Sequence, residues 1–314
     1  MQFWVDNLPN TRTEETTNES YVNNFENHIK PFFSKLNLGV SEVRQQHIES
    51  FITQQHQSGR VDGKGGVKSR SIKKYVANIS KTFDLAIKKG LISHNPTLRV
   101  EYPRDDEPYE ADFYTAEEIE KLLKLCKGKP LEVPIILATH FALRRAEIKG
   151  LRWQDIDFKQ NTMTIRNTRV RITTETEKKP KNKSSHRTFP LIPTVKPFLE
   201  RLYAEQQQQA EQFGSDYIFN DYVCKWPNGK KYDVGYANRA LGKLLQKNGM
   251  RHICLHGLRH SAASYLQKLG VSDKLIQIWM GHSDIRTTMN IYTHVDTSMK
   301  EDTANQIGKL FGNL

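Results

Sequence analysis

The sequence is poor in cysteine and lacks both a long apolar run and the start typical of a secreted protein. Only Cys126, Cys224 and Cys254 occur among 314 residues, and no two of them form a C-x-x-C pair. This set supports neither a disulfide framework nor a thiolate zinc site, so we expect a reducing, cytoplasmic setting. No run of about 18 apolar residues is present, which excludes a membrane-spanning helix. The opening MQFWVDNLPNTRTEE lacks the basic start and apolar stretch of a secretory signal.

Acidic residues are outnumbered, and the basic excess is concentrated in two places. The chain has 47 Lys and Arg against 35 Asp and Glu, a net charge of +12. Residues 55–90 hold nine basic and two acidic side chains, and residues 164–190 hold eight and two. Residues 1–54 are net acidic. Two basic stretches in separate parts of the chain indicate a protein that contacts nucleic acid from two sides.

The first third of the chain reads as helical. Over residues 19–33, apolar side chains recur at helical spacing, at Tyr21, Val22, Phe25, Ile29 and Phe32 or Phe33. A second helix follows from Ser41 or Glu42. Residues 71–90 form a strongly amphipathic helix with an apolar stripe from Ile72 to Ile87. Glycine-rich residues 59–71 are a loop. Prolines and acids without periodicity fill residues 95–114. We therefore expect an N-terminal extension (1–18), a helical domain (19–101), a linker (102–114) and a second domain (115–314).

In the second domain, the spacing of apolar residues changes from helical to strand-like and back to helical along the chain. Thr115 and Glu118 form a capping box that opens a helix, and a second apolar helix begins at Pro134. TMTIRNTRVRITTETE and HRTFPL alternate like strands, with the basic turn KKPKNKSS between them. Helices return after residue 194. The sequence thus predicts a mainly α fold with one small antiparallel β-sheet in two domains.

Several candidate site residues are weak signals one at a time. His256 and Arg259 form an H-x-x-R pair that chance alone supplies easily. His252, His256 and His260 recur every four residues, but no acid or thiolate accompanies them. We therefore favour hydrogen-bonding or phosphate-facing roles over a zinc site, and we expect neither a metal nor another cofactor.

Taken in order, three segments carry a specific pattern: HFALRRAEIKGLRWQDID at 140–157, HGLRHSAASYLQKLG at 256–270 and MGHSDIRTTMNIYTHV at 280–295. Together with the basic turn, the chain resembles the tyrosine recombinase (phage integrase) family. The resemblance is closest to integrases of phages and conjugative transposons. It implies that the catalytic residues are Arg144, Lys181, His256, Arg259, His282 and the nucleophile Tyr292. Glu147 matches a supporting acid, and Lys183 remains an alternative to Lys181. Ala142 and Ala146 depart from the usual Gly and Ser.

These residue types suit phosphodiester chemistry on physical grounds. In-line attack on a phosphodiester builds negative charge, which the forks of Arg144 and Arg259 can meet bidentately. The histidines can donate hydrogen bonds or move protons near neutral pH. Lys181 can protonate the leaving 5′-oxygen. Tyr292 needs nearby cations to favour its phenolate. As in the family, this tyrosine would form a 3′-phosphotyrosyl link without a metal.

The resemblance also implies partners. Double-stranded DNA would lie in a clamp between a core-binding domain and the catalytic domain. Candidate DNA contacts are Lys64, Lys68, Arg70, Lys73, Lys74, Arg166, Arg169, Arg171 and Lys183. We expect a dimer or tetramer on DNA. An amphipathic C-terminal helix either docks on a neighbouring protomer or packs on its own domain. We also expect an accessory DNA-bending or excision factor as a partner. The expected location is the nucleoid of a prokaryotic cell.

Other functions remain open at this point. A catalytically inactive DNA-binding regulator on the same fold would have no use for the full Arg, Lys, His, Arg, His and Tyr set. A type IB topoisomerase-like relaxase shares the chemistry. A metal-dependent nuclease would need a carboxylate cluster, and none accompanies the basic residues. Met1 precedes the first expected helix by about 18 residues, so the chain is either a member of the family that lacks an arm-binding domain or a truncated form of a longer protein.

Overall fold

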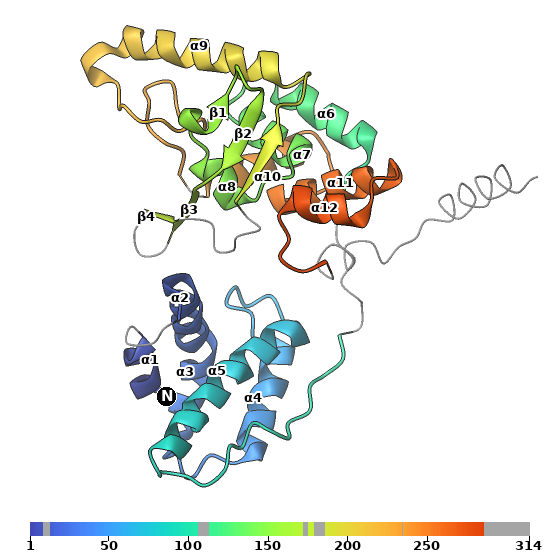
Figure 1. Ribbon diagram of the computed structural model, residues 1–314. Coiled ribbons are helices and arrows are strands. Elements are labelled where there is room, and N and C mark those ends of the chain that lie inside the picture. The colour runs from blue at the N-terminus through green and yellow to red at the C-terminus, as the bar shows by residue number, and fades with distance from the viewer. Residues whose placement is uncertain (9–12, 106–112, 172–174, 179–185, 234, 286–314) are drawn as a thin grey trace, which may run out of the picture. The chain divides into compact units, whose positions relative to one another are not determined.

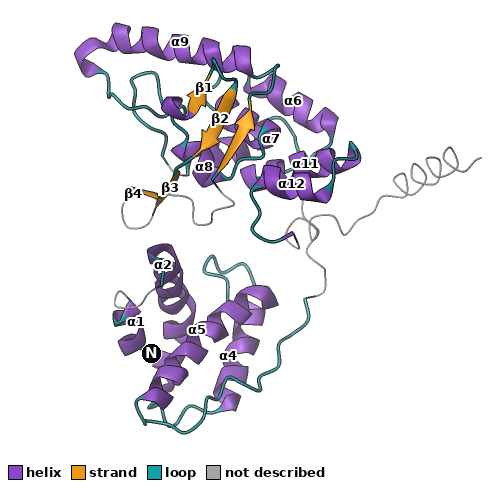
Figure 2. Ribbon diagram, in the orientation of Figure 1, coloured by secondary structure: helices purple, strands orange, loops and turns teal. Residues whose placement is uncertain are grey.

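The chain divides into two compact units, Met1–Tyr109 and Glu110–Leu314. The computed structural model describes residues 1–8, 13–105, 113–171, 175–178, 186–233 and 235–285 (Figure 1). Lys181, Lys183, Tyr292 and the C-terminal tail lie outside these ranges. The predicted mainly helical architecture with a small antiparallel sheet is confirmed (Figure 2).

The first unit is all helical. Its helices are α1 (Gln2–Asp6), α2 (Glu15–Asn24), the π-helical turn η2 (Phe25–Ile29), α3 (Lys30–Leu36), α4 (Gln45–Ser58) and α5 (Ser69–Lys88). On α5, the expected apolar stripe is buried from Ile72 to Ala86, but Ile87, expected at its end, is exposed. Gly90 follows the helix with a φ of 71°. A positive φ is costly for residues with a Cβ, so glycine suits the end of this helix.

The start of the chain differs from the expectation. We expected an extension before the first helix at residue 19, but α1 begins at Gln2 and α2 at Glu15. Val5 and Leu8 are buried in the core of the first unit. A five-residue helix is too short to show a hydrophobic period, which is why the sequence did not indicate it.

A π-helical turn alters the face of the expected helix 19–33. Phe25 and Ile29 are buried as expected, whereas Val22 is exposed. The turn η2 takes more residues than a turn of α-helix, so the side chains before and after it are rotated relative to each other. Spacing alone assumes an unbroken α-helix and therefore places Val22 on the wrong face.

The second unit packs helices around short strands. The helices are α6 (Ala116–Cys126), α7 (Glu132–His140), α8 (Arg145–Gly150), α9 (Lys196–Phe213), α10 (Tyr236–Lys247), α11 (Leu255–Lys268) and α12 (Asp273–Met280), with 3-10 turns η3 (Trp153–Asp155) and η5 (Gly214–Asp216). The strands are β1 (Ile156–Asp157), β2 (Thr162–Ile165), β3 (Thr168–Arg171), β4 (Glu175–Lys178) and β5 (Arg187–Pro190). The capping box forms, because Glu118 accepts from the Thr115 amide and Thr115 from the Glu118 amide.

The strands form two sheets where we expected one. β1, β2 and β5 make an antiparallel sheet, and β3 and β4 pair separately as a hairpin. The break between β2 and β3 coincides with a close approach of α8. A Cβ on Gly150 would come within 2.7 Å of the Asn167 carbonyl oxygen, so only glycine allows this contact. The alternating sequence did not reveal this tertiary constraint.

Three helices of the second unit hold the region that carries the candidate site. α7 is buried from Val133 to Ala138 and packs along α11, and α11 in turn packs on α12. Tyr114 is fully buried, and its amide donates to the Ser261 hydroxyl on α11 over 2.8 Å. None of the helices in the described ranges is both long and apolar enough to cross a bilayer.

Candidate active site

The site is built around the C-terminal end of α12. Gly281 follows this helix with a φ of 63°, which a glycine adopts without strain. The amides of Gly281 and His282 donate back to the carbonyls of Ile278 and Gln277. The next carbonyls toward the end of the helix have no partner within it, as at every helix C-terminus. They need donors from elsewhere in the molecule.

Three arginines from three other segments supply those donors. Arg187 Nε donates to the carbonyl of Trp279 over 3.0 Å, and Arg259 Nη2 donates to that of Met280. Arg144 Nη2 donates to the carbonyl of Gly281 over 2.6 Å. Cations at a helix C-terminus also interact favourably with the helix dipole. Consecutive carbonyls of one helix end are thus fixed by β5, α11 and the start of α8.

Glu147 joins the same arginines from the opposite side. Its carboxylate accepts from Arg187 Nη1 and Nη2, both at 3.0 Å, and from Arg144 Nη1 at 2.8 Å. Arg259 Nη1 lies 3.9 Å away. Burial by itself would raise the pKa of Glu147, but the hydrogen bonds and charge of Arg187, with the charges of Arg144 and Arg259, lower it to about 2. The group is therefore a permanent anion that holds three cations together.

The two arginines expected from the sequence differ in exposure. Arg259 is fully buried on α11, and its Nη1 donates to the carbonyl of Ala142. Arg144 caps the N-terminus of α8, and its side chain is 33% exposed. Of the two, Arg144 is therefore the arginine that a ligand arriving from solvent reaches first. The segment 141–144, which connects α7 to α8, brings the two arginines together.

The histidines of the site are neutral at physiological pH. Burial and the charges of Arg259 and Arg144 lower the pKa of His282 to about 3. Burial and the same two arginines also lower the pKa of His256, whose ring centroid lies 4.4 Å from that of His260. Burial and His256 lower the pKa of His260 to about 4. A neutral imidazole can accept a proton as well as donate a hydrogen bond.

The structure therefore brings together five of the residues singled out in the sequence: Arg144, Glu147, His256, Arg259 and His282. Arg187 also belongs to the site and was not expected from the sequence. It lies in HRTFPL, whose alternation predicts a strand, and the one signal for it is a charge at an inward-facing position of that strand. Strand β5 alternates buried and exposed residues, and Arg187 occupies a buried one.

The site has the electrostatics of an anion-binding centre. Three guanidiniums meet one carboxylate, and the histidines add no negative charge. Among the residues that the structure describes, no three His, Cys, Asp or Glu side chains gather as metal ligands would. Paired arginine forks match the geometry of phosphate oxygens better than lysine does. The arrangement is suited to binding a phosphate and stabilising added charge on it.

The candidate DNA-binding residues outside the site fall into three groups. Exposed side chains are Lys64, Lys68, Arg70, Lys73 and Lys74 on and before α5, and Arg166 after β2. Arg169 was expected to contact phosphate, and this was wrong. It is buried, donates to the carbonyl of Tyr232 and stacks on the Tyr222 ring at 4.9 Å. The side chain of Arg171, like Lys183, lies outside what the structure describes.

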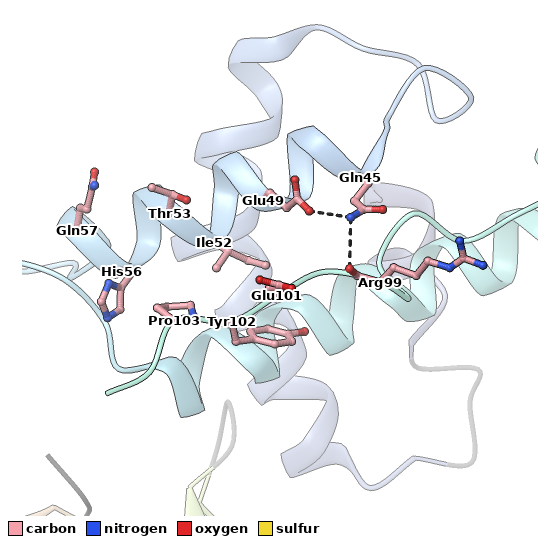
Figure 3. A pocket seen from close by; sticks show the side chains of 10 residues that line it. All are labelled: Gln45, Glu49, Ile52, Thr53, His56, Gln57, Arg99, Glu101, Tyr102 and Pro103. Carbon is pink, nitrogen blue, oxygen red and sulfur yellow. Dashed lines mark hydrogen bonds between the residues drawn. The ribbon is translucent and has the colours of Figure 1, made fainter. Parts of the chain in front are cut away.

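A cavity of about 590 Å³ lies in the first unit, far along the chain from these arginines. α4 lines one wall from Gln45 to Gln57, and residues 99–103 line the other (Figure 3). Gln45 joins the walls by donating to the Arg99 carbonyl, and it also donates to Glu49 on its own helix. The carboxylates of Glu49 and Glu101 disfavour a phosphate here. The chemistry therefore belongs to the arginine cluster of the second unit.

Known proteins share both units of this chain. Residues 112–299 match the phage integrase family, and residues 5–101 match the phage integrase SAM-like domain. A "tyrosine recombinase XerC-like" protein of Caldanaerobacter subterraneus is 28% identical over 99% of this chain and 82% of its own length. The transposase from transposon Tn916 of Enterococcus faecalis is 28% identical over 75% of this chain, which spans 62% of that protein.

Solved structures share the fold. The Tn1549 transposon integrase in complex with a circular intermediate DNA superposes with a TM-score of 0.72 at 19% identity, covering 96% of each chain. A lambda integrase dimer bound to a COC′ core site gives a TM-score of 0.68 at 17% identity, covering 94% of this chain and 79% of that one. At such identities the likeness supports the arrangement of elements and nothing finer.

Ala142 offers a test of backbone strain beside Arg259. Its φ of 51° lies in the left-handed region, although it is fully buried and carries a Cβ. We expect Ala142→Gly to stabilise the second unit by up to about 1 kcal/mol in urea unfolding, because glycine adopts this conformation without strain. The control Ala263→Gly lies within α11 and should destabilise by about 1 kcal/mol. If Ala142→Gly destabilised the protein, the backbone at Ala142 would not be strained.

Glu147 should give the protein a distinct acid dependence. Its pKa is lowered from 4.5 to about 2, so its contribution is complete above pH 4.5 and is lost as the pH falls through 2. We expect this loss to amount to about 3 kcal/mol. Glu147→Gln should be less stable than wild type at pH 7, and the difference should shrink below pH 4.5 in chemical unfolding. A difference independent of pH would contradict the charge pairing.

Proposed function

The chain belongs to the phage integrase family, and from that premise we propose that it is a site-specific DNA recombinase that cleaves and rejoins duplex DNA through Tyr292. The observation that carries the proposal is the cluster of Arg144 and Arg259 on the buried Glu147, beside the neutral His256 and His282. Tyr292 follows His282 by ten residues in the sequence.

In the proposed first step, the phenolate oxygen of Tyr292 attacks the phosphorus of one phosphodiester. The bond from phosphorus to the 5′-oxygen breaks, and a 3′-phosphotyrosyl ester forms. Arg144 and Arg259 bind the non-bridging oxygens, where charge builds up in the transition state. A 5′-hydroxyl of a second strand then attacks the ester, restores the diester and releases the tyrosine. The number of phosphoester bonds is unchanged, so the exchange needs no external energy source.

Proton transfer completes the proposed mechanism. His256, which is neutral at pH 7, accepts the phenol proton, and His282, whose pKa of about 3 makes it a poor base, donates a hydrogen bond instead. A lysine of the basic turn, Lys181 or Lys183, donates a proton to the leaving 5′-oxygen. The arginines supply the positive charge that a metal ion would otherwise provide, and on this ground we propose that the reaction is metal-independent.

We further propose that both units contact double-stranded DNA. The exposed Lys64, Lys68, Arg70, Lys73 and Lys74 would bind the phosphate backbone from the first unit, and Arg166 from the second. Such contacts give affinity and register and make binding strongly dependent on salt. We also propose that an accessory DNA-bending or excision factor assists the reaction and that the protein acts at the prokaryotic nucleoid.

We also propose a dimer or tetramer on DNA, joined through the C-terminal helix. The tail carries Met299, Ile307, Leu310 and Phe311 at helical spacing. A largely apolar cavity of about 330 Å³ on the second unit, lined by residues of α6, α7 and α11, supports the proposal as an acceptor for such a helix from a neighbouring protomer.

Covalent capture tests the nucleophile and the lack of a metal requirement. Wild-type protein and Tyr292→Phe are incubated in EDTA with sheared DNA of the source genome, denatured and recovered, and the attached DNA is sequenced. We expect adducts at one inverted-repeat locus with the wild type alone, because phenylalanine has no oxygen to attack phosphorus. Both proteins should bind DNA with the same steep salt dependence.

Other outcomes of the capture are equally informative. Adducts with Tyr292→Phe would contradict the nucleophile. Adducts that require Mg²⁺ would contradict metal independence. DNA binding by the wild type without any adduct would favour a catalytically inactive regulator.

The lysine assignment has its own test. A suicide substrate with a 5′-bridging sulfur has a leaving group that needs no protonation, because a thiol ionises far more readily than an alcohol. We expect Lys181→Ala to cleave the ordinary substrate at least about 100-fold more slowly and the sulfur substrate at close to the wild-type rate. Lys183→Ala is the matched control. The reverse pattern would assign the role to Lys183, and loss on both substrates would contradict general acid catalysis.

A further inference from the structure

Arg187 directs its whole guanidinium inward. Both terminal nitrogens donate to Glu147 at 3.0 Å, and Nε donates to the Trp279 carbonyl at 3.0 Å. Its side chain is only 7% exposed, against 33% for Arg144. The planar group also lies over the Phe189 ring of its own strand, with a 5.0 Å separation from the centroid. Arg187 therefore has no fork to offer a phosphate arriving from solvent.

Arg187 contacts the site along two routes. The first runs through Glu147, whose carboxylate also accepts from the side chain and the amide of Arg144. The second runs through Trp279, the neighbour of the two residues whose carbonyls bind Arg259 and Arg144. His282 follows them directly. Arg187 thus fixes Glu147 and the end of α12 relative to each other.

We propose that Arg187 is a positioning residue for strand cleavage, acting through Glu147 and the end of α12 on Arg144 and His282 without touching DNA. This inference rests on the proposed function. A bidentate pair fixes the plane of the Glu147 carboxylate as well as its distance. That plane decides where Arg144 Nη1 lies. Lysine would keep the charge beside Glu147 but, as a single point charge, could not fix the plane.

The sequence position of Arg187 adds a third connection. It is the first residue of β5 and pairs with Ile165 on β2. It follows Lys183 by four residues in the sequence, directly after the basic segment that carries both candidate lysines. The bonds of Arg187 to Glu147 therefore fix the start of β5, where the described chain resumes after this segment, relative to the arginines.

The test compares cleavage rate with DNA affinity in Arg187→Lys. On a suicide substrate under single-turnover conditions, we expect cleavage to slow about 10- to 100-fold, because small displacements of catalytic groups are costly. The dissociation constant for the site should stay within about threefold, because Arg187 does not touch DNA. Arg239→Lys is the matched control: this exposed arginine pairs with Asp233 at 2.7 Å, and the variant should match wild type in both measurements. Wild-type cleavage by Arg187→Lys, or a parallel loss of affinity, would overturn the proposal.

A double-mutant cycle with Glu147 separates positioning from an independent role. If Arg187 acts through Glu147, then Arg187→Lys should slow the Glu147→Gln protein by less than about threefold. If Arg187 acts independently, the two effects should multiply. A multiplied loss would overturn the proposed route through Glu147.

Amide hydrogen exchange tests the same inference without a measurement of DNA cleavage. The amides of Gly281 and His282 are bonded within the end of α12. We expect peptides covering residues 276–283 to exchange at least about threefold faster in Arg187→Lys, and those of α9 to be unchanged. Unchanged exchange at 276–283 would overturn the positioning role. If wild-type protein formed no adduct, the recombinase proposal would fail, and the exchange result would still decide the role of Arg187.

Discussion

The buried carboxylate of Glu147 is the interaction on which the site depends. A lone carboxylate at 1% exposure would be protonated or would unfold its surroundings, because burial disfavours charge. Here three guanidiniums surround it, and the pKa falls to about 2. The converse also holds: Arg259, itself fully buried, needs an anion and carbonyl acceptors to remain charged in the interior. Neither the acid nor the arginines would be tolerable alone.

The end of α12 completes this arrangement. A helix C-terminus has carbonyls without partners and a partial negative charge. Trp279, Met280 and Gly281 each direct one carbonyl to a different arginine. The same contacts that satisfy the helix therefore determine the position of His282 and the point from which the chain continues toward Tyr292. The hydrogen bonds that cap the end of α12 are therefore the same bonds that hold the residues of the site together.

The sequence predicted those parts of the candidate site that short-range motifs carry. The H-x-x-R spacing places His256 and Arg259 one turn apart on α11, and the family resemblance singled out Glu147, three residues after Arg144. It did not predict Arg187 as part of the site or Arg169 as buried, because burial of an arginine depends on tertiary partners. The sequence likewise showed only that Ala142 departs from the glycine usual in the family. Only the structure reveals its φ of 51°.

The charge balance explains how the site can be both stable and ready to bind. One carboxylate among three guanidiniums leaves an excess of positive charge, while the carbonyls of α12 supply acceptors but no net charge. Arg187 is committed to the interior by Glu147 and Trp279, so reorganising it on binding would be costly. Arg144 alone among the three is substantially exposed. An arriving phosphate therefore meets donors that are already oriented, which is the condition under which electrostatic stabilisation of a transition state is most effective.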